Sequence, residues 1–77
     1  MNVETLFREV LFIEEETELT DVTGPDDIDA WDSLGHVNII TAVEDEYDVE
    51  ITPEEITEIS SIGDIKKLLQ RKGISTE

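Results

Sequence analysis

Residues 33–47 carry the pattern that most restricts the fold, because their apolar side chains recur three or four positions apart. This spacing places one apolar stripe along an α-helix. The stripe consists of Leu34, Val37, Ile39, Ile40, Val43 and Tyr47. Asp32 and Ser33 come immediately before it, and both are residue types that cap the first turn of a helix. The sequence therefore predicts a helix over residues 33–47 that holds the Ser33 hydroxyl at the surface.

The two sides of this predicted helix differ. We expect one side to face a core, namely Ile39, Ile40, Val43 and Tyr47. The side nearest Ser33 should be more exposed, and it carries Leu34, Val37, Asn38, Thr41, Glu44 and Asp45.

Helical patterns also occur before and after this segment. Apolar spacing predicts a first helix over residues 2–14, which should fray or stop where Glu14–Glu16 oppose the negative end of the helix dipole. Thr52, followed by proline and later glutamate, predicts the start of a short helix that runs to about Ile59. A last helix, capped by Ser60 or Ser61, should end before Gly73. We expect Lys66, Lys67, Arg71 and Lys72 there to compensate the helix dipole and aid solubility.

These segments predict an all-α fold. They favour a small antiparallel bundle of three main helices plus a short third helix, in a single domain over residues 1–77.

The long segment 15–32 contains turn residues and isolated apolar side chains. We expect the apolar side chains to strap this loop onto the core, with Trp31 as a plug beside the helix start. These anchors are Leu19, Val22, Ile28 and Trp31. The aspartates of the loop do not fit an EF-hand, because counting from Asp27 places Trp31 at a ligand position, and no dedicated metal site is predicted.

Composition narrows the classes of function. The 77 residues carry a net charge of −16, and no Lys or Arg lies between Glu9 and Ile65. This charge should repel nucleic acid and anionic membranes and favour partners with basic surfaces. The chain has no Cys, which excludes disulfides, thiolate metal sites and a cysteine nucleophile. A chain this short has little room for a catalytic cleft, so we do not expect an enzyme.

Two further interpretations concern single features. His36 is close to Ser33 and Asp32, but neighbours this near in sequence cannot form a catalytic triad. We expect a solvated histidine or a partner contact. Residues 1–5 lack the pattern of a signal peptide and no apolar run reaches membrane-spanning length, so we expect a cytoplasmic protein without membrane insertion.

The motif Asp32-Ser33-Leu34, followed by an apolar-periodic helix that ends in Glu44-Asp45-Glu46-Tyr47, resembles the acyl carrier proteins. The resemblance covers nearly the whole chain. It implies that Ser33 receives 4′-phosphopantetheine from coenzyme A through a phosphopantetheinyl transferase, with Asp32 and Leu34 completing the motif. The attached thiol would hold acyl groups as thioesters, in a monomeric carrier that has no catalytic residue and no thiol of its own.

In the family that it resembles, the exposed side of the Asp-Ser-Leu helix binds partner enzymes. The resemblance therefore implies a partner surface that acyl-transferring and acyl-modifying enzymes with basic patches recognise, comprising Leu34, Val37, Thr41, Glu44 and Asp45. Gly35 and Asn38 stand where family members often have acidic residues. This departure leaves fatty-acid synthesis, a related polyketide-like pathway and a dedicated pathway for hydroxy- or aminoacyl units all open. A different class, an acidic interaction module or nucleic-acid mimic without a prosthetic group, explains the charge but not the motif.

Overall fold

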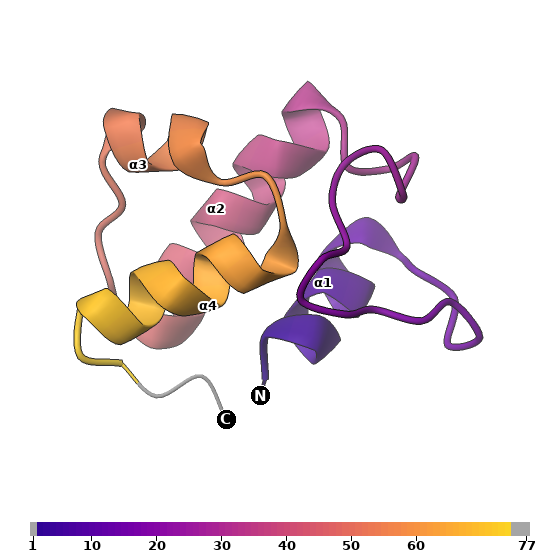
Figure 1. Cartoon of the computed structure of the whole chain (residues 1–77), viewed down its shortest axis with the longest axis horizontal. Coiled ribbons are helices and arrows are strands. Elements are labelled where there is room, and N and C mark those ends of the chain that lie inside the picture. The colour runs from indigo at the N-terminus through magenta and orange to yellow at the C-terminus, as the bar shows by residue number, and fades with distance from the viewer. Residues whose placement is uncertain (1, 75–77) are drawn as a thin grey trace.

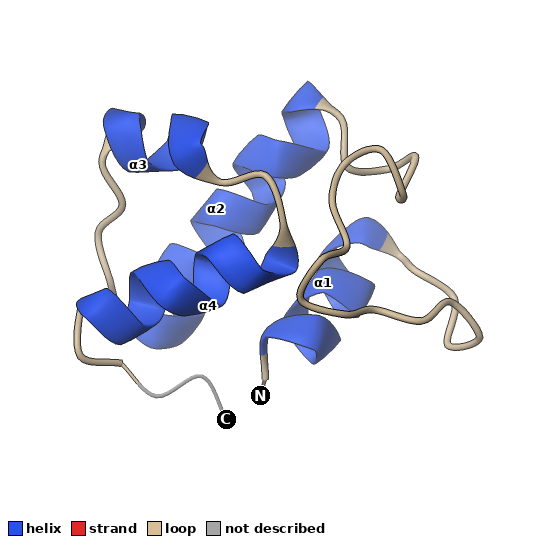
Figure 2. Cartoon of the chain, in the orientation of Figure 1, coloured by secondary structure: helices blue, strands red, loops and turns tan. Residues whose placement is uncertain are grey.

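The computed structural model describes residues 2–74, and within that range the chain forms four helices and no strand (Figure 1, Figure 2). The helices are α1 (Val3–Leu11), α2 (Ser33–Tyr47), α3 (Pro53–Glu58) and α4 (Ile62–Arg71). The predicted all-α class, with three main helices and a short third one, is confirmed.

Each helix begins at a polar side chain that accepts a backbone N–H of the first turn, a bond that satisfies a donor with no intrahelical partner. The N-caps are Asn2, Asp32, Thr52 and Ser61. At α3, Thr52 and Glu55 form both bonds of a capping box. These local signals explain why the starts of α2, α3 and α4 lie where the sequence predicts them.

Helix α1 ends earlier than predicted. Its C-cap is Phe12, which adopts a left-handed backbone conformation with φ 55° and ψ 44°, so the helix stops at Leu11 rather than near residue 14. Arg8 holds the departing chain, because its guanidinium donates to the carbonyl oxygens of Glu14 at 2.6 Å and Thr17 at 2.7 Å. Helix α1 therefore ends through a local backbone turn, before the acidic run is reached.

One apolar core lies between the helices, and α1 packs against both α2 and α4. Its fully buried side chains include Val3, Phe7, Trp31, Ile39, Val43, Ile62, Ile65, Leu68 and Leu69. Among the predicted loop anchors, Ile28 and Trp31 are buried and Leu19 is half-buried. The anchor role predicted for Val22 is wrong, because this side chain is 85% exposed and the neighbouring Thr23 is buried instead.

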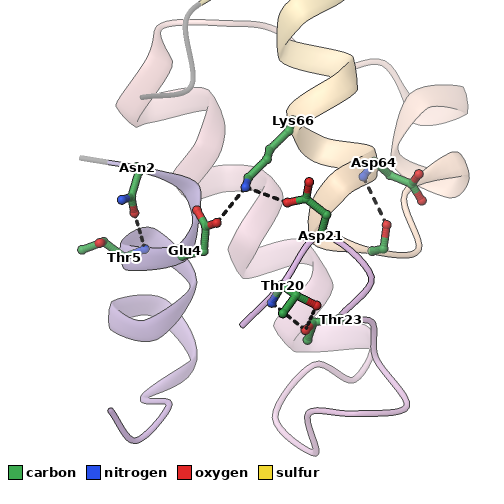
Figure 3. Close-up of polar contacts among 9 residues, drawn as sticks. Asn2, Glu4, Thr5, Thr20, Asp21, Thr23, Asp64 and Lys66 are labelled. Atoms are coloured by element: carbon green, nitrogen blue, oxygen red, sulfur yellow. Dashed lines mark hydrogen bonds and ion pairs between the residues drawn. The ribbon is translucent and has the colours of Figure 1, made fainter. Parts of the chain in front are cut away.

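Lys66 connects three segments that are distant in the sequence (Figure 3). Its Nζ atom in α4 lies 2.7 Å from Glu4 Oε2 in α1 and 2.7 Å from Asp21 Oδ1 in the long loop. The hydrogen bonds that Lys66 donates, first to Asp21 and then to Glu4, raise the pKa of Lys66. Lys66 thus links α1, α4 and the long loop, a role beyond the dipole compensation and solubility predicted for the basic cluster.

Within residues 2–74, none of the helices combines the length and the apolar character needed to cross a lipid bilayer.

Candidate functional site

Ser33 is the first residue of α2 and its side chain is exposed. The capping role belongs to Asp32, whose Oδ1 accepts the backbone N–H of Gly35 at 2.8 Å. In the described residues 2–74, the Ser33 hydroxyl has no hydrogen-bond partner. The fold therefore holds the Ser33 hydroxyl at a fixed position at the start of α2, where a reactant from solution can reach it.

Gly35 lets the start of α2 approach the preceding loop closely. The residue is buried, and a Cβ atom there would collide with the Ala30 carbonyl oxygen and lie 3.3 Å from a methyl of Leu11. No larger side chain fits without moving the loop. This packing explains why position 35 is glycine in this chain, where the acyl carrier proteins that it resembles often have an acidic residue.

Trp31 forms the predicted plug. It is 2% exposed, and its ring meets Phe7 edge to face with centroids 4.8 Å apart. Its Nε1–H donates to Nδ1 of His36 at 2.9 Å, and the two rings lie nearly parallel, at 15°, with centroids 6.1 Å apart. The loop is therefore fixed to α2 next to Ser33.

His36 is half-buried and fully engaged, so the prediction of a solvated histidine is wrong. Because Nδ1 accepts from Trp31, the proton lies on Nε2, which donates to the Ile56 carbonyl oxygen at 3.0 Å. His36 thus joins the loop, α2 and the end of α3. Spacing alone gives no signal for this bridge, since Ile56 is 20 positions away.

An open depression of about 450 Å³ lies beside Ser33 and is lined by Pro25, Trp31, Asp32, Ser33 and His36. None of its polar side chains is placed to activate the hydroxyl, because Asp32 caps the helix and both nitrogens of His36 are hydrogen-bonded. The site can thus accept a group delivered by another enzyme, and it has no general base of its own.

The predicted partner surface lies along the outer side of α2. Leu34 is 70% and Val37 56% exposed, and Thr41 and Asp45 are also exposed. Glu44 differs, because it is half-buried and its Oε2 accepts the backbone N–H of Ile51 at 3.0 Å. Glu44 therefore has a structural task, and the binding role of the whole surface stays a prediction.

Two of the loop aspartates have local hydrogen-bonding roles. Asp27 Oδ2 accepts the backbone N–H of Gly24 at 3.0 Å, while Asp32 caps α2. Across residues 2–74, no group of three or more His, Cys, Asp or Glu side chains gathers in a way that could hold a metal ion. That the chain has no dedicated metal site remains a prediction.

Comparison with known proteins places this geometry in context. A family model described as "Phosphopantetheine attachment site" matches residues 3–69, which include all four helices up to Leu69. The acyl carrier protein of Buchnera aphidicola subsp. Acyrthosiphon pisum is 32% identical over 77 residues, covering 95% of each chain. The acyl carrier protein of Clostridium acetobutylicum is 48% identical over 40 residues, or 52% of this chain and 51% of that protein.

The structural comparison agrees with the sequence comparison. The solution NMR structure of holo acyl carrier protein from Geobacter metallireducens superposes with a TM-score of 0.80 at 32% identity. The match covers 92% of this chain and 84% of that one. The similarity thus extends over nearly the whole helical bundle rather than over the serine motif alone.

Proposed function

From the premise that this chain belongs to the acyl carrier protein family, we propose that Ser33 is the residue to which its 4′-phosphopantetheine is attached. Members of this family are carriers and not enzymes, and the prosthetic group is covalently bound. We propose further that residues 1–77 act as a single carrier domain.

The position of Ser33 supports this assignment. The hydroxyl is exposed at the first position of α2 and is not used as a cap, which is the observation that carries the proposal. The N–H groups of the first turn form the positive end of the helix dipole, where a phosphodiester anion is favoured. The open depression beside Ser33 offers room for the attached group. The residues present therefore fit 4′-phosphopantetheine.

Attachment is a simple group transfer. The Ser33 Oγ–P bond forms, the phosphoanhydride bond of coenzyme A breaks, and 3′-phosphoadenosine 5′-phosphate leaves. A base of the transferase takes the serine proton, and nothing is oxidised or reduced. Asp32 and Gly35 fix the start of α2 during this encounter, and Trp31 and His36 hold the adjoining loop. When attached, the group supplies the thiol that this chain lacks.

The partners are a phosphopantetheinyl transferase and enzymes that transfer or modify acyl groups. We place their docking on Leu34, Val37, Thr41 and Asp45, with Glu44 contributing less because it already bonds the chain before α3. The acidic field between residues 9 and 65 favours basic enzyme surfaces. The proposed role is the presentation of acyl intermediates in fatty-acid or related acyl biosynthesis. Tethering makes each later encounter effectively intramolecular.

Intact mass spectrometry tests the attachment. Apo protein is incubated with coenzyme A and a broad-specificity phosphopantetheinyl transferase. The wild type should gain one phosphopantetheinyl unit, Ser33→Ala should gain none, and the control variant Ser60→Ala, on an exposed serine before α4, should gain one. A modified Ser33→Ala protein would exclude Ser33 as the site.

A further inference from the structure

Phe12 combines two unfavourable features. Its backbone is left-handed at φ 55°, a conformation that residues with a Cβ atom rarely adopt, and its side chain is 90% exposed to solvent. Glycine at this position would end α1 without either penalty. The end of α1 therefore explains the left-handed turn, but it does not explain why an exposed aromatic side chain is found there.

The surroundings of Phe12 connect it to the attachment site. One open depression of about 270 Å³ lies between the end of α1 and the start of α2, and Phe12, Asp32, Leu34 and Asn38 are among its lining residues. Leu34 directly follows Ser33 and is itself 70% exposed. Two exposed apolar side chains, Phe12 just after α1 and Leu34 in α2, thus border a depression that both sequence neighbours of Ser33 help to line.

Phe12 also lines a second depression, of about 250 Å³. Its lining includes Glu14, Asp27 and Asp29, and in residues 2–74 none of these carboxylates forms an ion pair. Arg8, the cation nearest in sequence, donates to the backbone carbonyl oxygens of Glu14 and Thr17 rather than to these carboxylates. Phe12 therefore forms an apolar ridge that borders two depressions, one shared with Leu34 and one that carries three carboxylates without an ion pair in residues 2–74.

We propose that Phe12, together with Leu34, is an anchoring contact for the phosphopantetheinyl transferase that modifies Ser33, so this inference rests on the function proposed above. The complementary transferase surface is an apolar side chain flanked by Lys or Arg, which would face the depression and the adjoining carboxylates. The transferase is the natural occupant because it must reach the Ser33 hydroxyl itself. Enzymes that act later react at the distal end of the attached arm and need not reach the Ser33 hydroxyl.

The substitution Phe12→Gly separates docking from folding, because the two should change in opposite directions. Glycine accepts the left-handed backbone, so the thermal midpoint should rise. Binding is measured by titration calorimetry in the Ser33→Ala background, where no transfer occurs. The affinity for a broad-specificity phosphopantetheinyl transferase should fall roughly tenfold, as expected for loss of an aromatic anchor. With Ser33 present, kcat/KM for loading should fall similarly while the final mass still shows complete loading.

Two further variants make the test specific. Phe12→Leu keeps an apolar side chain and should retain most of the affinity. Val22→Ala removes another exposed apolar side chain, in a depression lined by α4 residues, and should leave binding and loading at the wild-type level.

The possible results are distinct. Wild-type affinity and kcat/KM in Phe12→Gly would overturn this inference alone, and a lowered thermal midpoint would show that Phe12 holds the fold instead. A wild-type protein that is never loaded at Ser33 would overturn the proposed function, and this inference with it.

Discussion

Helices α2 and α4 both pack against α1, but their polar side chains have different tasks. On α4, Lys66 joins α1 and the long loop, and Asp64 Oδ2 accepts both the backbone N–H and the hydroxyl of Ser60 at 3.0 Å. Lys72, at the end of α4, pairs with Glu55 of α3 at 3.1 Å. Asp64, Lys66 and Lys72 are thus used within the molecule, whereas Lys67 and Arg71 form no ion pair in residues 2–74.

The outer side of α2 presents the opposite arrangement. Leu34, Val37, Thr41 and Asp45 are exposed, and within residues 2–74 none of them is bonded to another element. The inner side of the same helix is closely packed, with Gly35 against the loop and Ile39 in the core. The difference indicates that the fold is secured by α4 and by the inner side of α2, which leaves the outer side of α2 available to partners.

The largest effect is expected from Gly35→Ala, on the inner side of α2. The added Cβ meets the Ala30 carbonyl oxygen, which is backbone and can move only with the loop. Despite the better helix propensity of alanine, the free energy of unfolding in urea should fall by roughly 1–3 kcal/mol. Asn38→Ala, on the exposed side of the same helix, is the matched control and should change stability by less than about 0.5 kcal/mol. Equal stability of Gly35→Ala and wild type would mean that the Ala30 carbonyl does not lie as close to α2 as described.

A smaller effect is expected from acid at the start of α4. The backbone hydrogen bond from Ser60, and next the Ser60 hydroxyl, lower the pKa of Asp64. The folded state therefore favours the ionised carboxyl, and its contribution is complete above the ordinary carboxyl pKa of about 4. Stability should be lost as the pH falls through the lowered pKa.

Urea unfolding across a pH series measures this loss. In Asp64→Asn the decline of the unfolding free energy below about pH 4 should be shallower than in wild type. Ser60→Ala removes only the hydroxyl bond and should have an intermediate profile. Superimposable profiles of Asp64→Asn and wild type would show that this carboxylate does not stabilise the start of α4.

The sequence predicted those parts of the fold that depend on local signals. Asp32 before an apolar stripe and Thr52-Pro53 before glutamates define helix starts within a few residues, and the observed bounds of α2 equal the predicted residues 33–47. The end of α1 was placed too late, because apolar spacing continues to Ile13 while the left-handed turn at Phe12 leaves no comparable pattern. Local chemistry therefore fixes where helices begin better than where they end.

Contacts between distant segments were beyond sequence reasoning. The pairs that Lys66 makes with Glu4 and Asp21 span 62 and 45 positions, and the bond from His36 to Ile56 spans 20. Val22 was expected to be buried on its apolar character alone. At the candidate site, the position of Ser33 at the start of α2 followed from its neighbours, whereas the exposed ridge at Phe12 depends on how α1 meets α2.

The contrast between α4 and the outer side of α2 is tested most directly by making the same Asp→Asn change at two positions. One is a partner of Lys66 in α4, and the other lies on the outer side of α2. Asp21→Asn removes a negative charge that pairs with Lys66, and Asp45→Asn removes an exposed carboxylate of α2, with the same change in net charge. For each variant we would measure urea unfolding and the kcat/KM of Ser33 loading by a phosphopantetheinyl transferase at low and high salt. Asp21→Asn should lower the unfolding free energy by less than about 1 kcal/mol and load at the wild-type rate. Asp45→Asn should keep its stability and load more slowly at low salt, with the difference shrinking as salt is added. Slower loading of Asp21→Asn with normal loading of Asp45→Asn would contradict the division of tasks between the two helices.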